Sequence, residues 1–130
     1  MIKSGMRLIE EAKQNITEVN VQKVADEISQ EQDIIIIDVR ESAEYSQGHL
    51  PDAINFPRGV LEVKLHTHPD FKDEESPLDE MNKKSIYLYC QSGGRSALAT
   101  ESLLRMGFNH VYSMAGGFDA WKKASQKIQN

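Results

Sequence analysis

Short apolar runs recur along the chain and are separated by amphipathic segments. Four consecutive isoleucines at 34–37 lie between two aspartates, a pattern typical of a strand that is buried on both faces. Residues 85–89 (Ser-Ile-Tyr-Leu-Tyr) predict a second buried strand, and shorter strands are expected at 16–19, 53–55 and 110–112. Because strands buried on both faces belong to parallel sheets covered by helices, the pattern predicts an α/β sandwich with a mostly parallel sheet.

Helical periodicity fills most of the intervals between these strands. One helix is expected after an N-cap at Asn20, and others are expected at 7–15, 41–47, 58–65 and 96–106. A last helix follows Gly116-Gly117, and we expect its Phe118 and Trp121 to pack in the core. Residues 66–84 are polar, acidic and interrupted by prolines, so this stretch is expected to be a surface excursion.

The overall composition indicates one globular domain in a chain of 130 residues. The net charge of -5 speaks against a nucleic-acid or anionic-membrane partner, since both need a basic surface. The longest aliphatic run, at 34–37, is too short to span a bilayer, and the N-terminus lacks the apolar core of a signal peptide. We therefore expect a cytoplasmic protein.

The single cysteine, Cys90, cannot form an internal disulfide, so any chemistry it performs is that of a free thiol. It directly follows the strand at 85–89 and precedes a helix, a position where α/β proteins bind ligands. Gly93 and Gly94 allow the intervening backbone to turn its N–H groups inward and, with the helix N-terminus, to stabilise a thiolate. The alternative is a buried and inert cysteine, which packs like a small apolar residue.

Several motifs occur in a recognisable order: Asp38-Val39-Arg40 with Glu44, then the segment 48–55 (Gly-His-Leu-Pro-Asp-Ala-Ile-Asn), the segment 89–96 (Tyr-Cys-Gln-Ser-Gly-Gly-Arg-Ser), and the segment 116–121 (Gly-Gly-Phe-Asp-Ala-Trp). Together they resemble a single-domain rhodanese over residues 16–124, with an N-terminal helical extension at 1–15 and a tail at 125–130. The resemblance implies a three-layer sandwich around a five-stranded parallel sheet.

The resemblance also implies site residues. Cys90 would be the nucleophile that carries a persulfide, and the donor would be bound by the residues that follow it: Gln91, Ser92, Gly93, Gly94, Arg95 and Ser96. Asp38 and Arg40 match positions that brace this loop through polar contacts. Two departures concern Glu44 and Ser92, because the similar two-domain thiosulfate enzymes carry a basic residue and a lysine at these positions. Weaker thiosulfate binding is therefore expected, with Arg95 compensating in part.

The predicted function is a sulfurtransferase that moves a sulfane sulfur from thiosulfate, a polysulfide or a protein persulfide to cyanide or a thiol. Two alternatives remain open: a sulfur carrier or interaction module that does not turn over, and a cysteine phosphatase. The phosphatase cradle has five residues between Cys and Arg, whereas four separate Cys90 from Arg95. No cofactor or metal is expected, because His66 and His68 lack further ligands at useful spacing. The acidic segment 70–80 is a solvated loop or a docking surface for a basic partner.

Overall fold

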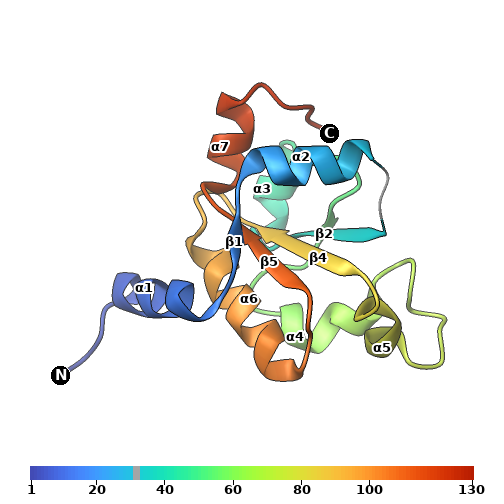
Figure 1. Cartoon of the computed structure of the whole chain (residues 1–130), viewed down its shortest axis with the longest axis horizontal. Coiled ribbons are helices and arrows are strands. Elements are labelled where there is room, and N and C mark those ends of the chain that lie inside the picture. The colour runs from blue at the N-terminus through green and yellow to red at the C-terminus, as the bar shows by residue number, and fades with distance from the viewer. Residues whose placement is uncertain (31–32) are drawn as a thin grey trace.

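A five-stranded, all-parallel sheet forms the centre of the molecule. The computed structural model describes residues 1–30 and 33–130, and its strands follow the order β1-β5-β4-β2-β3 (Figure 1). Their bounds are β1 (Glu18–Val19), β2 (Ile34–Asp38), β3 (Ile54–Asn55), β4 (Ser85–Tyr89) and β5 (Val111–Met114). The predicted parallel α/β architecture is confirmed, and β4 lies at the centre of the sheet.

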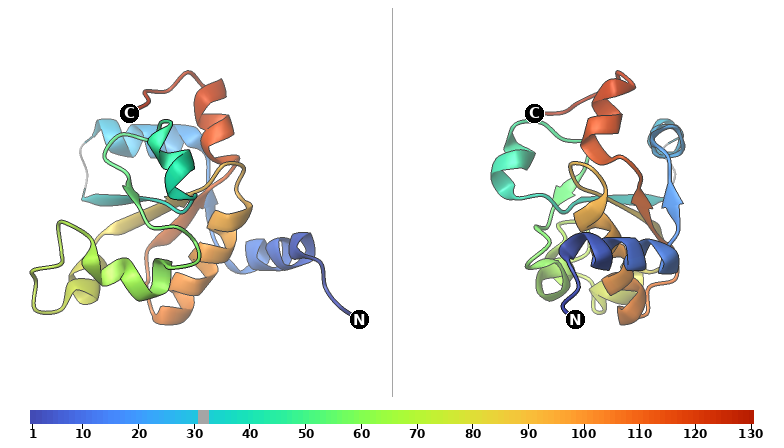
Figure 2. Two further views of the ribbon diagram at one scale, coloured as in Figure 1. Left: turned by 180° about the vertical axis from the view of Figure 1, so that it is seen from behind. Right: turned by 90° about the vertical axis from the view of Figure 1, so that its left-hand side faces the viewer.

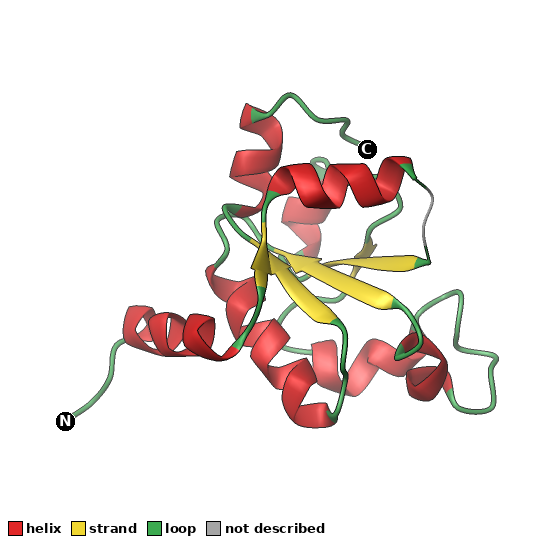
Figure 3. Cartoon of the chain, in the orientation of Figure 1, coloured by secondary structure: helices red, strands yellow, loops and turns green. Residues whose placement is uncertain are grey.

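Helices cover both faces of the sheet, which gives the predicted three layers (Figure 3). One face carries α2 (Val21–Ser29), α3 (Ser42–Ser46) and α7 (Gly117–Lys123). The other carries α4 (Leu61–Lys64), α5 (Pro77–Met81) and α6 (Gly94–Met106). The N-terminal helix α1 (Gly5–Asn15) lies outside these layers and packs on α6 (Figure 2). No helix in the described part of the chain is long and apolar enough to cross a membrane.

Side chains alternate between two apolar clusters on the two faces of the sheet, as the period of a strand requires. Along β4, Ile86 and Leu88 enter the cluster beneath α4, α5 and α6, and Cys90 continues this series. Tyr87 and Tyr89 enter the opposite cluster, where the predicted core residues Phe118 and Trp121 are buried. The strand pattern therefore places the cysteine on the α6 side of the sheet.

The region 66–84 differs from its prediction as a polar surface excursion. The 3-10 helix η1 (Leu65–Thr67) and α5 lie within or beside it, and His68, Phe71 and Met81 are buried. Pro77 occupies the first turn of α5, where a missing N–H costs nothing, so it begins a helix instead of preventing one. Smaller differences concern α4, which is shorter than the expected helix at 58–65, and α6, which begins at residue 94 instead of 96.

Candidate active site

Cys90 lies at the carboxyl end of the central strand, and its side chain is only 1% exposed. Its Sγ accepts hydrogen bonds from the backbone N–H groups of Gly93, at 3.1 Å, and Ser96, at 3.4 Å. The Ser96 hydroxyl lies 3.6 Å from the sulfur and shares a 2.8 Å hydrogen bond with the hydroxyl of Ser113. The two backbone N–H groups thus form a cradle of donors around the sulfur.

The loop takes this shape because two glycines permit it. Gly93 caps α6 with φ 107, a left-handed conformation that a side chain rarely adopts, and its N–H is thereby turned to the sulfur. Gly117 has φ 57, and a Cβ there would collide with the backbone of Cys90 and Gln91. The close approach lets the N–H groups of Phe118 and Asp119 bind the carbonyl oxygens of Cys90 and Gln91, at 2.8 and 3.0 Å.

Because these two carbonyl oxygens are bound by the N-terminus of α7, they point away from the sulfur. The thirteen-residue helix α6 begins directly after Gly93, so its positive end adds to the field of the inward N–H groups. The cradle is thus assembled from the end of β4, the start of α6 and the start of α7.

Asp38 and Arg40 form a buried pair behind the loop. The Arg40 guanidinium binds Asp38 through Nε and Nη2, the shortest contact being 2.8 Å, and the side chains are 2% and 0% exposed. Arg40 also donates to Gln91 Oε1 at 3.1 Å and to the Gly48 carbonyl at 2.8 Å. The Gln91 amide in turn donates to Asp119 at 2.6 Å. The Asp38–Arg40 pair therefore holds the side chain of Gln91, the residue that follows Cys90, in place.

Tyr89 completes this buried network, and its hydroxyl donates to Asp38 Oδ2 at 2.6 Å. Burial raises the pKa of Tyr89, and the nearby Asp38 carboxylate raises it further, so the hydroxyl stays protonated and remains a donor. The Arg40 guanidinium also lies 4.4 Å from the centre of the Phe118 ring. The Asp38 carboxylate therefore accepts hydrogen bonds from both Arg40 and Tyr89.

Arg95 and Glu44 meet at the rim of the site in a two-point ion pair, with contacts of 2.8 and 3.1 Å. The hydrogen bonds from Arg95 lower the pKa of Glu44 to about 2, against the opposing effect of its partial burial. Glu44 also accepts from the Glu41 N–H in the capping box of α3, which holds the carboxylate in place. The cation expected to grip a donor anion is thus neutralised by a side chain of the same chain.

The predicted site residues otherwise divide into buried and accessible groups. Gly93 and Ser96 are buried beside the sulfur, whereas Gln91, Gly94 and Arg95 are partly exposed and Ser92 is exposed. Ile9 of α1 fills the space where Gly94 would carry a side chain, so the N-terminal helix touches the loop. The accessible side chains around the buried Cys90 are therefore those of Gln91, Ser92 and Arg95.

Sequence reasoning did not identify Ser113, Tyr89 and Gly117 as parts of this site. Ser113 lies in β5 and Tyr89 precedes the cysteine inside a strand, so both read as ordinary strand residues. A signal existed for Tyr89 and Gly117, because the motif segments 89–96 and 116–121 include them. His49, the second residue of the motif at 48–55, places Nδ1 2.8 Å from the Leu50 carbonyl.

Comparison with known proteins shows which family this chain resembles. Residues 20–124 match the model of the rhodanese-like domain. A sulfurtransferase of Allochromatium vinosum is 26% identical over 83% of this chain and 90% of that protein. Thiosulfate sulfurtransferase 16 from the chloroplast of Arabidopsis thaliana is 42% identical over 67% of this chain and 72% of its own length. Thiosulfate sulfurtransferase GlpE of Coxiella burnetii is 31% identical over 74% and 78%.

Two further matches bear on the alternatives. A putative sulfur carrier protein of Bacillus subtilis, YrkF, is 27% identical over 82% of this chain and 51% of its own length. Among solved structures, a protein of unknown function from Rhodopseudomonas palustris, described as a possible tyrosine phosphatase, superposes with a TM-score of 0.81. It is 28% identical, and the match covers 99% of this chain and 96% of that one.

Proposed function

This chain belongs to the rhodanese-like family, and on that premise we propose that it is a sulfurtransferase in which Cys90 carries the transferred sulfur as a persulfide. The observation that supports this most directly is the cradle of N–H groups from Gly93 and Ser96 around Sγ. Such donors stabilise the attacking thiolate and then the terminal sulfur of the persulfide.

In the first step the Cys90 thiolate attacks the outer sulfur of the donor. A bond forms between Sγ and that sulfur while the donor's own sulfur bond breaks, and the leaving group departs with the electron pair as an anion, which is sulfite when thiosulfate is the donor. In the second step a thiolate or cyanide attacks the outer sulfur, and the Cys90 thiolate leaves. No proton has to move in either displacement, which agrees with a site where, among residues 1–30 and 33–130, the sulfur's hydrogen-bond partners are Gly93 and Ser96 and include no histidine.

The donor class follows from the charges at the rim. Because Glu44 neutralises Arg95, the entrance offers a dianion such as thiosulfate little net attraction. The persulfide of a partner protein carries at most one negative charge on its sulfur pair, whereas thiosulfate and inorganic polysulfides are dianions. We therefore propose that a protein persulfide is used more efficiently than thiosulfate.

The test is the intact mass of the protein after incubation with thiosulfate or polysulfide. Wild type is expected to gain the mass of one sulfur, about 32 Da, in a form that cyanide removes by thiol–disulfide-type exchange. Cys90→Ser is expected to gain nothing. A cyanide-labile adduct of equal yield on Cys90→Ser would contradict the proposal.

A stoichiometric sulfur carrier is the second candidate, and the neutralised Arg95 favours it because a carrier needs no binding site for a small donor. Cyanide-dependent turnover separates the two functions. Many thiocyanate molecules per Cys90, at a rate absent from Cys90→Ser, are expected of an enzyme. A single release of one sulfur per chain would identify a carrier.

A further inference from the structure

The outer edge of β2 is only half covered. The neighbouring strand β4 pairs with β2 from Ile34 to Asp38, whereas β3 pairs only with the last two residues, Ile37 and Asp38. The N–H and C=O groups of successive residues point to alternate sides of a strand. The Asp33 carbonyl accepts from the N–H of Ser85 in β4, and the Val39 N–H donates to the carbonyl of Tyr89 in β4. The N–H and C=O of Ile34 therefore face the opposite side, where the described chain provides no strand.

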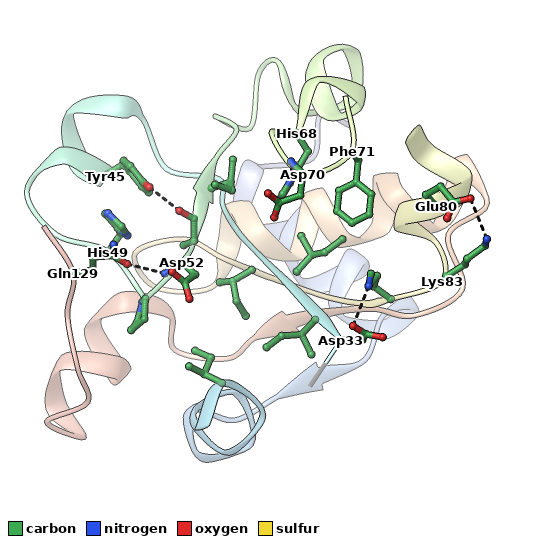
Figure 4. Close-up of a pocket in the computed structure, with 18 of the residues that line it drawn as sticks. Asp33, Tyr45, His49, Asp52, His68, Asp70, Phe71, Glu80, Lys83 and Gln129 are labelled. Carbon is green, nitrogen blue, oxygen red and sulfur yellow. Dashed lines mark hydrogen bonds and ion pairs between the residues drawn. The ribbon is translucent and has the colours of Figure 1, made fainter. Parts of the chain in front are cut away.

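A hollow of about 1070 Å³ lies along this uncovered edge (Figure 4). Its wall includes the β2 residues at 34–36 and the adjoining Ala53 and Ile54, and His68, Asp70 and Phe71 line it from the segment before α5. Its lining is partly apolar where β2 forms the wall. It runs from the beginning of β2 to the loop before β3 and includes Tyr45 and His49, but neither Cys90 nor residues 91–96, so the hollow is distinct from the sulfur site.

The charges around the hollow are unbalanced. Lys83 and Lys84 are engaged by Glu80 and Asp33, each at 3.0 Å. Three exposed carboxylates also line it, namely Asp52, Asp70 and Glu74, and none of them forms a salt bridge within residues 1–30 and 33–130. The net charge of the lining is therefore negative, which attracts a cationic ligand.

His68 supplies an uncommitted polar group in the same wall. Its side chain is only 3% exposed, and its Nδ1 accepts from the Asp70 N–H at 3.1 Å. Burial lowers the pKa of His68, so the ring is neutral near pH 7 and its proton lies on Nε2. That N–H has no protein partner among the described residues, so it is available to a carbonyl oxygen.

We propose that this groove binds an extended, Lys- or Arg-bearing segment of a partner protein, added as a strand beside β2. Open strand edges bind extended peptides through main-chain hydrogen bonds, and alternate side chains reach the flanking walls. The main chain of the segment would pair with Ile34, and its basic side chains would lie against Asp70 and Glu74. This surface leaves the entrance to Cys90 free, so docking and sulfur transfer take place on different sides of the molecule.

The probe is a fluorescently labelled peptide of alternating lysine and valine, Lys-Val-Lys-Val-Lys-Val, measured by fluorescence anisotropy at low and at physiological salt. We expect saturable binding that weakens with salt, and no binding of the Glu-Val analogue. The double variant Asp70→Asn/Glu74→Gln is expected to bind about tenfold more weakly. Asp73→Asn/Glu75→Gln is the matched control, because it removes the same charge from the same loop but outside the hollow.

Strand addition is tested separately from charge attraction. A peptide with alternate backbone amides N-methylated keeps its lysines but loses its ladder hydrogen bonds, so we expect its affinity to fall at least about tenfold. Ile34→Pro removes the open N–H and is expected to have the same effect. Ile34→Ala is its matched control, because it loses the same packing against the core but keeps the N–H, so it should bind the peptide like wild type. Equal binding of the N-methylated peptide, equal weakening by the control variant, or no binding even at low salt would overturn the proposal.

Discussion

The ion pair between Glu44 and Arg95 gives the sharpest prediction about the donor. Glu44→Gln removes the negative charge but keeps an oxygen that accepts from the Glu41 N–H, and a capping box works with either residue. Arg95 would then lose its two-point partner and regain its full charge at the entrance. We expect kcat/KM for thiosulfate to rise.

The size of the effect follows from Coulomb's law. A dianion about 7 Å from a carboxylate, at an effective dielectric constant of roughly 40, is repelled by about 2 kcal/mol. Screening over a Debye length of about 8 Å reduces this to about 1 kcal/mol, a factor of about five in rate. Because Arg95 is also released from Glu44, we expect a gain of about five- to fiftyfold that shrinks at high salt.

The assay is thiosulfate:cyanide sulfurtransferase activity below saturation, compared with transfer from an alkyl thiosulfonate, which donates the same outer sulfur, releases a sulfinate and carries one negative charge instead of two. The thiosulfonate should gain only about half as much in free energy, a factor of about two, since Glu44 repels half the charge. Asp73→Asn controls for the change in net charge, because this exposed residue lies outside the site. A fall in kcat/KM with both donors would refute the reasoning and would show that the carboxylate is needed to orient Arg95.

Three further predictions concern the framework of the site. Gly117→Ala is expected to lose about 2–4 kcal/mol of unfolding free energy in urea, because a Cβ would collide with the carbonyl of Cys90 in a backbone of positive φ. Arg40→Met should cost about 3–5 kcal/mol by leaving Asp38 buried without its partner, and adding Asp38→Asn should restore part of that loss. The lowered pKa of Glu44 means that its pairing stabilises the fold above about pH 4.5 and that this contribution disappears as the pH falls toward 2. The free energies of unfolding of wild type and Glu44→Gln, measured across that pH range, should therefore converge.

The sequence predicted those features that are encoded locally. The isoleucine run of β2 and the apolar residues of β4 predict buried strands by their composition. The position of Cys90 between a strand and a helix follows from the prediction of β4. The extent of α5 was missed because Pro77 was taken as a breaker, although it stands at the first turn of the helix. A proline marks a boundary, but the sequence alone does not tell which side of it is helical.

Contacts between distant segments could not be predicted in the same way. Arg95 and Glu44 are separated by 51 residues, and nothing in the spacing of either motif indicates that they pair. The sequence predicted that Arg95 would compensate for the missing cations, and only the structure shows that Glu44 neutralises it. The hydroxyl of Ser113 approaches Ser96 for a similar reason, because the register of β5 against β4 is a tertiary property.

The contact of α7 with the cysteine loop has a consequence for the protein during its synthesis. Phe118 and Asp119 bind the carbonyl groups of Cys90 and Gln91, yet they are made almost thirty residues later. While the ribosome is still adding residues before Gly117, these carbonyls have no partner and the donors around the sulfur are not held in place. The cradle around Cys90 is therefore completed only when nearly the whole domain has left the ribosome.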